Sequence, residues 1–468
     1  MSTSLLWIRN DLRIDDNPAL DLALEQGCHQ AVFFVTPHQW QQHDVADIKQ
    51  DFILRHAKLL QFQLKQVGVQ LQIIEVENYA EQVVLLQRYC EKHQIKQIFA
   101  NKELELNEIE RDRELISSGI NLTLTQADTI LPLGAVLNKQ GLMFKVFTPY
   151  KKAWLKQFSI TPFHIKPAMT TLPAYVEDHN VGRSANWPLS DHYLVNFFPQ
   201  FLQHKIANYD EERDFPALPA TSRVSPYLAI GAISVKRLVH QLMINQSQPN
   251  FSIEFGLESI GEQTWLSELI WREFYRNLLF HYPNLIKGKS FVEKYDNLLW
   301  PDHHELFLKW CDGKTGFPII DAAMRQLKQI GWMHNRLRMV VASFLTKNLL
   351  VNWRLGERYF MQHLIDGDFA ANNGGWQWSA GTGCDAQPYF RVFNPISQSK
   401  KFDPNGDFIR KYLPELKNVP AKDIHQPHKY LAETGQLSLY WSEIVDLNSS
   451  RQRAIEFYGM KYDSESLP

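Results

Sequence analysis

The chain has 468 residues, of which 44% are hydrophobic and 21% are charged, and its formal net charge is −2. This length exceeds one typical domain, and the composition is that of a globular protein with two or three domains. The four cysteines are scattered without CxxC or Cys/His ligand spacing, which excludes a disulfide framework and a zinc site. The sequence shows no secretory signal and no apolar run near the roughly 20 residues of a membrane span. We therefore expect a cytoplasmic protein without a metal, in which any nucleic-acid site is a local basic patch.

The first 130 residues alternate between short apolar runs and longer helical patterns. The apolar runs lie at 5–8, 31–35, 69–76 and 95–100. Amphipathic stretches at 51–66 and 80–92 lie between them. This alternation predicts an α/β domain with a parallel sheet over 1–130. Neither GxGxxG nor GxxxxGK[ST] occurs, so the common dinucleotide-binding and P-loop forms are not expected.

The remainder of the chain divides into a connection and a helical region. Residues 131–190 are punctuated by prolines and show weak periodicity, as expected of a long interdomain linker. From 191 to 468 apolar residues recur at helical spacing, which predicts an all-helical domain. Eight of the 13 tryptophans lie between 265 and 378. Such clustering fits a stacking surface for a cofactor or nucleobase, but a tryptophan-rich core explains it more simply.

The first unusual segment of the helical region is TSRVSP at 221–226. Ser225 is placed to cap a helix, and Pro226 fits its first turn. Hydroxyl groups and free backbone N–H groups at a helix start bind phosphate, and Arg223 adds positive charge. An ordinary capped helix is the simpler interpretation of this segment alone.

The second segment is WLSELIWREFYR at 265–276. Four of its side chains recur at i, i+3, i+4 and i+7, on one face of a helix: Glu268, Trp271, Arg272 and Tyr275. An acid beside an indole, a guanidinium and a phenol is unusual for a core stripe, because a buried carboxylate needs a partner. The face suits a flat heterocycle, or else an ion-paired helix surface with a buried aromatic edge.

The third segment, WMHNRLRM at 332–339, places Asn335, Arg338 and Met339 on one helix face. Basic residues flank it: Arg325, Lys328, Arg336, Lys347 and Arg354. They would form a surface that follows a phosphate backbone, unless they are simply a solvated helix face.

The fourth segment is DGDFAANNGGWQW at 366–378. Two aspartates around a glycine, followed by Asn-Asn-Gly-Gly, indicate a loop and not a core helix. The paired aspartates lack the spacing of a calcium loop and do not predict a metal. Trp376 and Trp378, two residues apart, could line a cavity.

Together these segments resemble the photolyase/cryptochrome family, specifically its class I cyclobutane-dimer photolyases. The match runs from LLWIRNDLRIDDNPAL near the N-terminus to FNPISQSKKFDPNGDFIRKYLPEL near position 416. Five further motifs carry it: TSRVSPYLAIGAIS, WLSELIWREFYR, GKTGFPIIDAAMRQL, GWMHNRLRM and LIDGDFAANNGGWQW. The resemblance implies an α/β antenna domain, a linker and a helical domain that holds FAD in a bent shape. It also implies an enzyme that repairs cyclobutane pyrimidine dimers with light.

The resemblance assigns FAD contacts residue by residue. They are Tyr209, Thr221, Ser222, Arg223, Val224, Ser225, Trp265, Glu268, Arg272, Asn335, Arg338, Asp366, Gly367, Asp368 and Asn372. Thr221 and Ser225 would meet the pyrophosphate at a helix start. Arg338, paired with Asp366, would reach the flavin edge, as would Asp368. The active flavin is a reduced anion, which nearby positive charge would stabilise.

Asn372 resembles the family residue opposite flavin N5, where photolyases have Asn and several signalling relatives have Asp or Cys. Trp376, Trp353 and Trp300 match the family's electron-relay tryptophans, although packing alone would also explain each of them. The catalytic set implied at the dimer is Glu268, Trp271, Asn335, Met339, Asn372 and Trp378.

The partner implied is double-stranded DNA with a flipped-out dimer, bound by a monomer that is nucleoid-associated when on DNA. Base flipping costs a few kcal/mol, and stacking on indoles offsets it by roughly 1–3 kcal/mol per base. Glu268 would hydrogen-bond a dimer carbonyl and stabilise the radical anion formed by electron transfer from excited reduced FAD. The DNA contacts implied are Arg213, Trp271, Arg272, Tyr275, Asn335, Arg336 and Trp378.

An antenna cofactor is also implied. His43, Asn107 and Glu108 resemble the residues that hold 5,10-methenyltetrahydrofolate in one branch of the family. Taken alone they are three ordinary polar residues, and a deazaflavin or no antenna is the alternative.

Four rival functions remain open. A cryptochrome photosensor would be expected to have a long polar tail, which does not follow the last family motif. A (6-4) photolyase uses a His-rich stretch where this chain has residues 332–335, with Met339 in place of a second His. Met339 and Trp378 also disfavour a single-strand-specific cryptochrome-like photolyase. The retained dimer-pocket residues argue against a non-catalytic flavin-containing DNA-binding protein.

Overall fold

The computed structural model describes residues 3–163, 165–166, 182–244 and 259–459. The chain forms two compact units. Unit 1 comprises Met1–Asp210, Ser222–Ile286 and Ile365–Asp368. Unit 2 comprises Glu211–Thr221, Lys287–Leu364 and Phe369–Pro468. None of the helices in the described part of the chain combines the length and the apolarity that a bilayer crossing requires.

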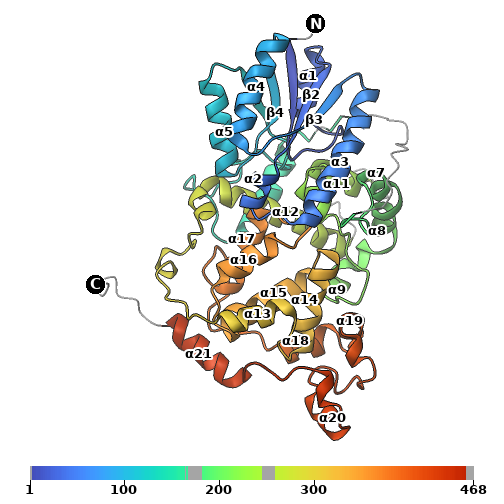
Figure 1. The fold of residues 1–468 in the computed structure, drawn as a ribbon, viewed down its shortest axis with the longest axis vertical. Helices are drawn as coiled ribbons and strands as arrows, with labels where there is room; N and C mark the ends of the chain where they lie inside the picture. The colour runs from blue at the N-terminus through green and yellow to red at the C-terminus, as the bar shows by residue number, and fades with distance from the viewer. Residues whose placement is uncertain (1–2, 164, 167–181, 245–258, 460–468) are drawn as a thin grey trace. The chain divides into compact units, whose positions relative to one another are not determined.

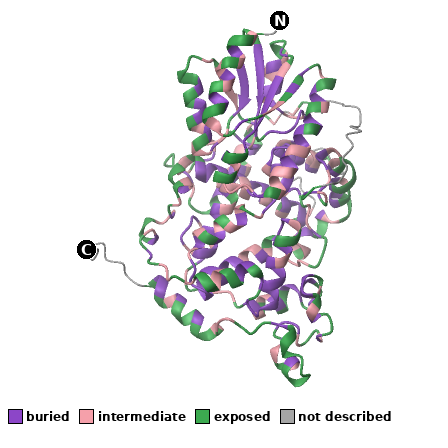
Figure 2. Ribbon diagram, viewed as in Figure 1, coloured by how far each residue is buried: buried purple, intermediate pink, exposed green. Residues whose placement is uncertain are grey.

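Unit 1 contains a five-stranded parallel sheet in the order β3-β2-β1-β4-β5. Its strands are β1 (Ser4–Ile8), β2 (Gln30–Val35), β3 (Gln70–Glu75), β4 (Gln97–Asn101) and β5 (Leu122–Thr125). The central strand β1 is buried throughout, whereas the edge strands β3 and β5 are partly exposed (Figure 2). The predicted α/β fold with a parallel sheet is confirmed, and β5 is a strand that the sequence analysis did not predict.

Helices cover both faces of this sheet (Figure 1). They are α1 (Pro18–Glu25), α3 (Asp47–Gln66), α4 (Tyr79–His93) and α5 (Leu106–Ser117). On one face Trp7 and Phe34 pack with Leu86 of α4 and Leu115 of α5. Side chains alternate along a strand, so Leu6 points to the opposite face, which α1 and α3 cover. The strand order reverses between β1 and β4, and such switch points commonly form binding crevices at the carboxyl ends of the strands.

One of the remaining helices of unit 1 lies between β2 and α3 in the chain, and the others follow the sheet. They are α2 (Pro37–Gln42), α6 (Phe147–Ile160), α7 (Ser190–His192), η1 (Tyr193–Phe197), α8 (Phe198–His204), η2 (Ile206–Asn208), the first half of α9 (Tyr209–Glu212), α10 (Ser225–Ala229), α11 (Val235–Ile244) and α12 (Ile260–His281). Helix α12 confirms the helix predicted over 265–276. It begins with a capping box, in which Ser259 and Glu262 each accept from the other's backbone N–H.

The compact units do not follow the predicted boundaries at 130 and 190, and those boundaries remain a prediction about functional domains. Helix α6 lies within the predicted linker, whose residues 164 and 167–181 lie outside the described structure. Glu273 on α12 ties this segment down, since it accepts from Trp154 Nε1 (2.7 Å) and from the backbone N–H of Ile130 (2.7 Å). Burial raises the pKa of Glu273 to about 7. The first part of the helical region therefore packs with the sheet in unit 1.

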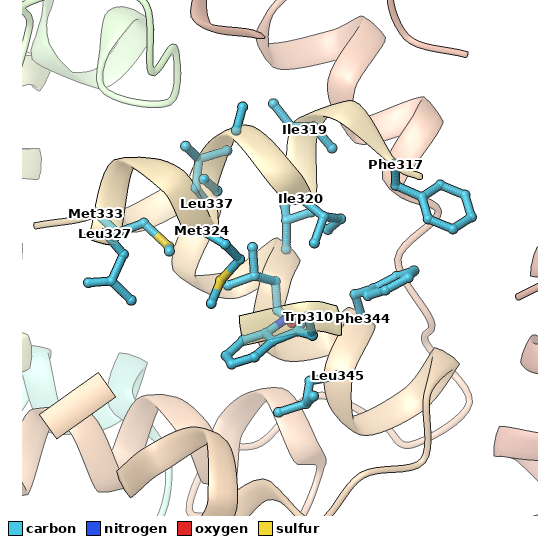
Figure 3. Close-up of a cluster of buried hydrophobic side chains, with 14 of the residues drawn as sticks. Trp310, Phe317, Ile319, Ile320, Met324, Leu327, Met333, Leu337, Phe344 and Leu345 are labelled. Atoms are coloured by element: carbon cyan, nitrogen blue, oxygen red, sulfur yellow. The ribbon is translucent and has the colours of Figure 1, made fainter. Parts of the chain in front are cut away.

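Every element that the structure describes after residue 190 is helical, as predicted. The helices of unit 2 include α13 (His304–Asp312), α14 (Pro318–Ile330), α15 (Asn335–Ser343), η5 (Phe344–Asn348), α16 (Trp353–Met361), α17 (Phe369–Ala380), α18 (Pro395–Phe402), α19 (Asp407–Tyr412), α20 (His428–Glu433) and α21 (Leu447–Gly459), together with the short 3-10 helices η4 (Glu293–Tyr295), η6 (Pro414–Leu416) and η7 (Leu437–Leu439). Their core is built around Trp310, which lies close to Met324 and Phe344 (Figure 3). The indole N–H of Trp310 donates to Val341 O (3.1 Å), so the one polar group of this large side chain has a hydrogen-bond partner inside the core.

Candidate functional site

The loop at 366–368 is held at each of its three residues by a side chain of unit 1. Ser225 Oγ donates to the first aspartate (2.6 Å), and Lys49 Nζ donates to the carbonyl of the glycine (2.7 Å). Arg276 pairs with the second aspartate. These side chains come from α10, α3 and α12, which are far apart in the sequence. Both aspartates predicted to contact FAD are thus held in defined positions.

Arg276 is a buried cation that pairs with several carboxylates. Its guanidinium lies 3.3 Å from Glu105 and 3.1 Å from Asp128, in addition to Asp368. Burial opposes its charge, but the three carboxylates together raise the pKa of Arg276. Arg276 therefore stays a cation, as a buried guanidinium needs such partners.

The predicted cap at Ser225 is wrong by one position. Helix α10 begins at Ser225, Val224 takes the cap position without a side-chain hydrogen bond, and Pro226 lies in the first turn as predicted. Ser225 is therefore the first residue of the helix, and its hydroxyl donates to the carboxylate of Asp366. Arg223, just before the helix, has a φ of 55°, which is uncommon for a residue other than glycine. The predicted phosphate contacts of 221–225 stay a prediction.

Other residues predicted to contact FAD gather around aromatic rings in unit 1. Trp265 is buried, and its indole N–H donates to Ser222 Oγ (3.2 Å). The Phe201 ring lies 5.8 Å from the ring of Trp265 and 5.9 Å from that of Tyr209. The structure therefore brings Tyr209, Ser222 and Trp265 into one neighbourhood.

The predicted face of α12 is confirmed. The four side chains at i, i+3, i+4 and i+7 are all half-buried, between residues that are mostly buried: Glu268, Trp271, Arg272 and Tyr275. Arg272 donates to the backbone carbonyl of Asp128 (2.6 Å) and pairs with its carboxylate. The indole of Trp271 stacks on Phe147 of α6, with centroids 3.6 Å apart and planes 8° from parallel. The face thus combines a fixed indole with a half-exposed carboxylate one turn away.

In unit 2, α15 and α17 present the other predicted residues on partly exposed faces. Asn335 is exposed, while Arg338 and Met339 are half-buried. Arg338 Nε donates to Met333 O (2.8 Å). Its predicted pairing with Asp366 would join residues of different units and stays a prediction. Trp378 on α17 is half-buried.

The expectation that 366–378 is a loop is wrong from Phe369 onward. Helix α17 runs through the Asn-Asn-Gly-Gly sequence. Tertiary contacts overcome the poor helix propensity of these residues. Asn372 Nδ2 donates to Glu357 O (2.9 Å), and Asn373 Nδ2 donates to Glu357 Oε1 (2.7 Å), so α17 is bonded to α16.

The three predicted relay tryptophans belong to unit 2. Trp376 and Trp353 are buried in its core, and Trp300 packs at the edge of that core. Trp376 lies against α16 where Gly356 leaves room, since a Cβ at Gly356 would come within 2.2 Å of the Trp376 ring. Trp353 lies on the same helix, one turn before Gly356. Trp300 contacts Phe457 with ring centroids 5.1 Å apart.

The three residues predicted to hold an antenna lie together in unit 1. Asn107 Nδ2 is 2.8 Å from His43 Nε2, and His43 Nδ1 is 3.6 Å from Glu108 Oε1. Tyr79 OH donates to the same Glu108 oxygen (2.7 Å). Burial raises the pKa of Glu108 to about 7 and lowers the pKa of His43. These residues follow the ends of β2, β3 and β4, at the carboxyl edge of the sheet.

Comparison with known proteins settles the family. The sequence matches the family models "DNA photolyase" over residues 4–173 and "FAD binding domain of DNA photolyase" over 265–460. It is 45% identical to the deoxyribodipyrimidine photo-lyase of Vibrio cholerae, over 97% of this chain and 98% of that protein. The chain belongs to the DNA photolyase family.

Solved structures agree with this assignment. A class III photolyase from Agrobacterium tumefaciens matches with a TM-score of 0.81 at 30% identity, over 97% of both chains. A cryptochrome from Synechocystis matches with the same TM-score of 0.81 at 27% identity, over 97% of this chain and 98% of that one. The photolyase fold is thus shared with a cryptochrome, and the fold alone does not separate repair from photosensing.

The basic residues predicted to flank 332–339 in this photolyase-family chain are mostly engaged with other groups of the protein. Lys347 is fully buried, its Nζ donates to Arg391 O (3.0 Å), and burial lowers the pKa of Lys347 to about 8. The others are ion-paired within unit 2: Arg325 with Glu415, Lys328 with Asp312, Arg336 with Asp214 and Arg354 with Asp296. Internal carboxylates therefore already neutralise much of the charge that the sequence suggested for phosphates.

Sequence reasoning missed several residues around these sites. It did not identify Phe147, Lys49 or Arg276, because each acts through a partner far away in the chain. Tyr79 and Glu105 could have been found, since both follow a predicted sheet strand and the carboxyl ends of parallel strands meet at one edge.

Proposed function

We propose that this protein repairs cyclobutane pyrimidine dimers in DNA, using FAD and blue light. The observation that carries the proposal is the half-exposed face of α12, where a stacked indole, Trp271, lies one turn from a carboxylate, Glu268. A flipped-out dimer needs a flat apolar platform and a hydrogen-bonding group for its carbonyls. The full-length match to a deoxyribodipyrimidine photo-lyase supports the same substrate.

The side chains present fit FAD. The side-chain Nδ2 of Asn372 donates to Glu357 O. The side-chain oxygen of Asn372 is then an acceptor suited to the protonated N5 of reduced flavin. The carboxylates of the 366–368 loop, held by Ser225 and Arg276, suit the N–H edge of a flavin ring. When bound and reduced, FAD supplies an electron donor that light excites.

The protein's own residues would then hold and prepare the substrate. Trp271 would stack on the extruded dimer, with its plane set by Phe147. Glu268 would hydrogen-bond a dimer carbonyl and stabilise the negative charge that develops there. Met339 and Trp378, half-buried on α15 and α17, would exclude water from the dimer. Asn335 would contribute a hydrogen bond from the start of α15.

The tryptophans would serve to reduce the cofactor rather than to repair DNA. Trp376 and Trp353 are buried in one core, with Trp300 at its edge. This progression from buried to partly exposed indoles fits electron delivery from the surface. We propose the order Trp300, Trp353, Trp376 for electrons that move inward.

The antenna that we propose is 5,10-methenyltetrahydrofolate, bound beside His43, Asn107 and Glu108. The partner is duplex DNA with cyclobutane dimers, bound by a monomer in the cytoplasm and on the nucleoid. The contacts among the three antenna residues support a polar binding site at the carboxyl edge of the sheet. A deazaflavin, or no antenna, is the alternative.

A repair assay tests the function directly. Purified, reduced protein and duplex DNA with one cyclobutane thymine dimer are exposed to blue light, with a dark sample as the control. Light-dependent recovery of thymines is expected. If FAD is bound and reducible but no thymine is recovered, repair of this lesion is wrong. A duplex with a (6-4) lesion, run in parallel, then separates a (6-4) photolyase from a photosensor.

A further inference from the structure

The 366–368 loop is hydrogen-bonded to a residue of the α/β part of unit 1 that is not among the proposed flavin contacts. Ser225 and Arg276 hold its two aspartates from the helical segments of this unit. Lys49 lies instead on α3, one of the helices that cover the sheet, and its Nζ donates to the carbonyl of Gly367 (2.7 Å). The two residues are separated by 318 positions in the chain.

Gly367 is the joint between the two aspartates. Glycine has more backbone freedom than any other residue, so the directions of Asp366 and Asp368 depend on how this joint is held. Each peptide unit is planar, and a bond to the Gly367 carbonyl therefore fixes the plane that includes the backbone nitrogen of Asp368. A single donor at this carbonyl orients the second aspartate relative to the first.

The environment of Lys49 matches this role. Burial lowers the pKa of Lys49, and charged groups of unit 1 surround its ammonium: Asp368, Glu105, Arg276 and Asp366. Lys49 is half-buried, and an ammonium that is partly removed from water is costly unless acceptors lie beside it. The Gly367 carbonyl is such an acceptor, so this bond stabilises both the ammonium and the loop.

We propose that Lys49 is a positioning residue for FAD, which locks the glycine joint and aims Asp366 and Asp368 at the flavin ring. This inference rests on the proposed function, because it takes the two aspartates as flavin contacts. It places a determinant of flavin binding in the α/β part of the chain, outside the segments assigned to FAD. Without the Lys49 bond the loop keeps its contacts with Ser225 and Arg276 but loses the one at the glycine joint, so part of its preorganisation for FAD is lost.

The test compares three variants in their flavin-free form. Lys49→Met keeps the apolar stem and removes the donor, and Lys49→Arg keeps a charged donor. Lys58→Met changes an exposed lysine of the same helix and serves as the matched control. Binding of FAD is measured by titration of each apo-protein, and the midpoint potential and absorption spectrum of the bound flavin are recorded.

We expect Lys49→Met to raise the dissociation constant for FAD about five- to twenty-fold, in line with the loss of one charge-assisted hydrogen bond. Its flavin potential and spectrum should also shift. Lys49→Arg should restore affinity to within about two-fold of wild type, and Lys58→Met should match wild type. A role in folding alone would lower the melting temperature without moving the potential or being rescued by Arg.

The outcomes separate this inference from the proposed function. If wild-type apo-protein does not bind FAD, the proposed function itself is wrong. If wild type binds FAD and folded Lys49→Met binds it equally, with an unchanged potential and spectrum, the role of Lys49 is wrong and the repair function stands. Should Lys49→Met not fold, Lys49→Gln, which keeps a neutral donor, is titrated in its place and judged by the same criteria.

Discussion

The indole of Trp271 lies flat against the ring of Phe147, with centroids 3.6 Å apart and planes 8° from parallel. Phe147 is buried on α6, whereas Trp271 is half-buried on α12. One face of the indole is therefore occupied by the protein's own ring, which holds the indole in one orientation. A platform whose plane is set in advance loses less entropy when a base stacks on it.

Replacing Trp271 with Ala should weaken binding to dimer-containing DNA by roughly 1–3 kcal/mol, because stacking on the extruded dimer is lost. Bound FAD should remain. Fluorescence anisotropy with damaged and undamaged duplexes measures the effect. Phe147→Leu should give a smaller loss, since the indole is kept but its plane is no longer held. Unchanged affinity of Trp271→Ala for the dimer would remove α12 from the substrate site.

Replacing Trp376 with Phe should stop photoreduction of oxidised flavin but spare repair by protein reduced beforehand, because only the electron supply is interrupted. Absorbance of the flavin under blue light with an external reductant measures the first effect. Trp310→Phe is the control, since Trp310 lies 6.1 Å from Trp376 by ring centroids but is not a proposed relay residue. Photoreduction of Trp376→Phe at the wild-type rate would contradict the relay.

Replacing Asp214 with Asn should strengthen binding to undamaged DNA, because the Arg336 guanidinium then loses the carboxylate that neutralises it. The slope of log affinity against log salt should steepen by up to about one unit if Arg336 gains a phosphate contact. Titrations at several salt concentrations measure this slope. The double variant with Arg336→Ala should lose the gain, and a gain that persists would assign the effect to another group.

Replacing Glu273 with Gln should flatten the pH dependence of stability between pH 5 and pH 8. Burial raises the folded-state pKa of Glu273 to about 7, above its ordinary value of 4.5. The stability contributed by its protonated form is therefore present below pH 4.5 and is lost as pH rises towards 7, by roughly 3 kcal/mol. Urea unfolding of both proteins at about pH 5 and about pH 8 measures the difference. Equal losses in the two proteins would contradict the assignment.

Replacing Glu108 with Gln should weaken binding of methenyltetrahydrofolate and leave FAD bound, because the carboxylate that Tyr79 and His43 contact is removed. Titration of folate-free protein, followed by absorbance, measures the effect. Glu110→Gln, at an exposed position of the same helix, is the matched control. If the wild-type protein binds no folate, the folate assignment is wrong, and binding of a deazaflavin is tested next.

Local patterns were sufficient for much of the fold and part of the site. Apolar runs separated by amphipathic stretches predict the parallel sheet, because each strand and helix buries its own face. The spacing of Glu268, Trp271 and Tyr275 predicts one helix face, and the structure confirms it. The same reasoning was wrong for α17, whose Asn-Asn-Gly-Gly sequence has a poor propensity for helix. Bonds from Asn372 and Asn373 to Glu357 provide the stabilisation that propensity lacks.

By itself, the sequence determined periodicity, fold class and the identity of the chemical groups, since these depend on neighbours within a few turns. The tertiary structure decided which groups have partners. The sequence predicts that Arg336 is a cation available to phosphates, but in the structure it pairs with Asp214, 122 positions away. Lys49 reads as an ordinary surface lysine but holds Gly367. Such pairs are set by how distant segments pack, because charge and hydrogen-bond satisfaction depend on distance in space and not on separation along the chain.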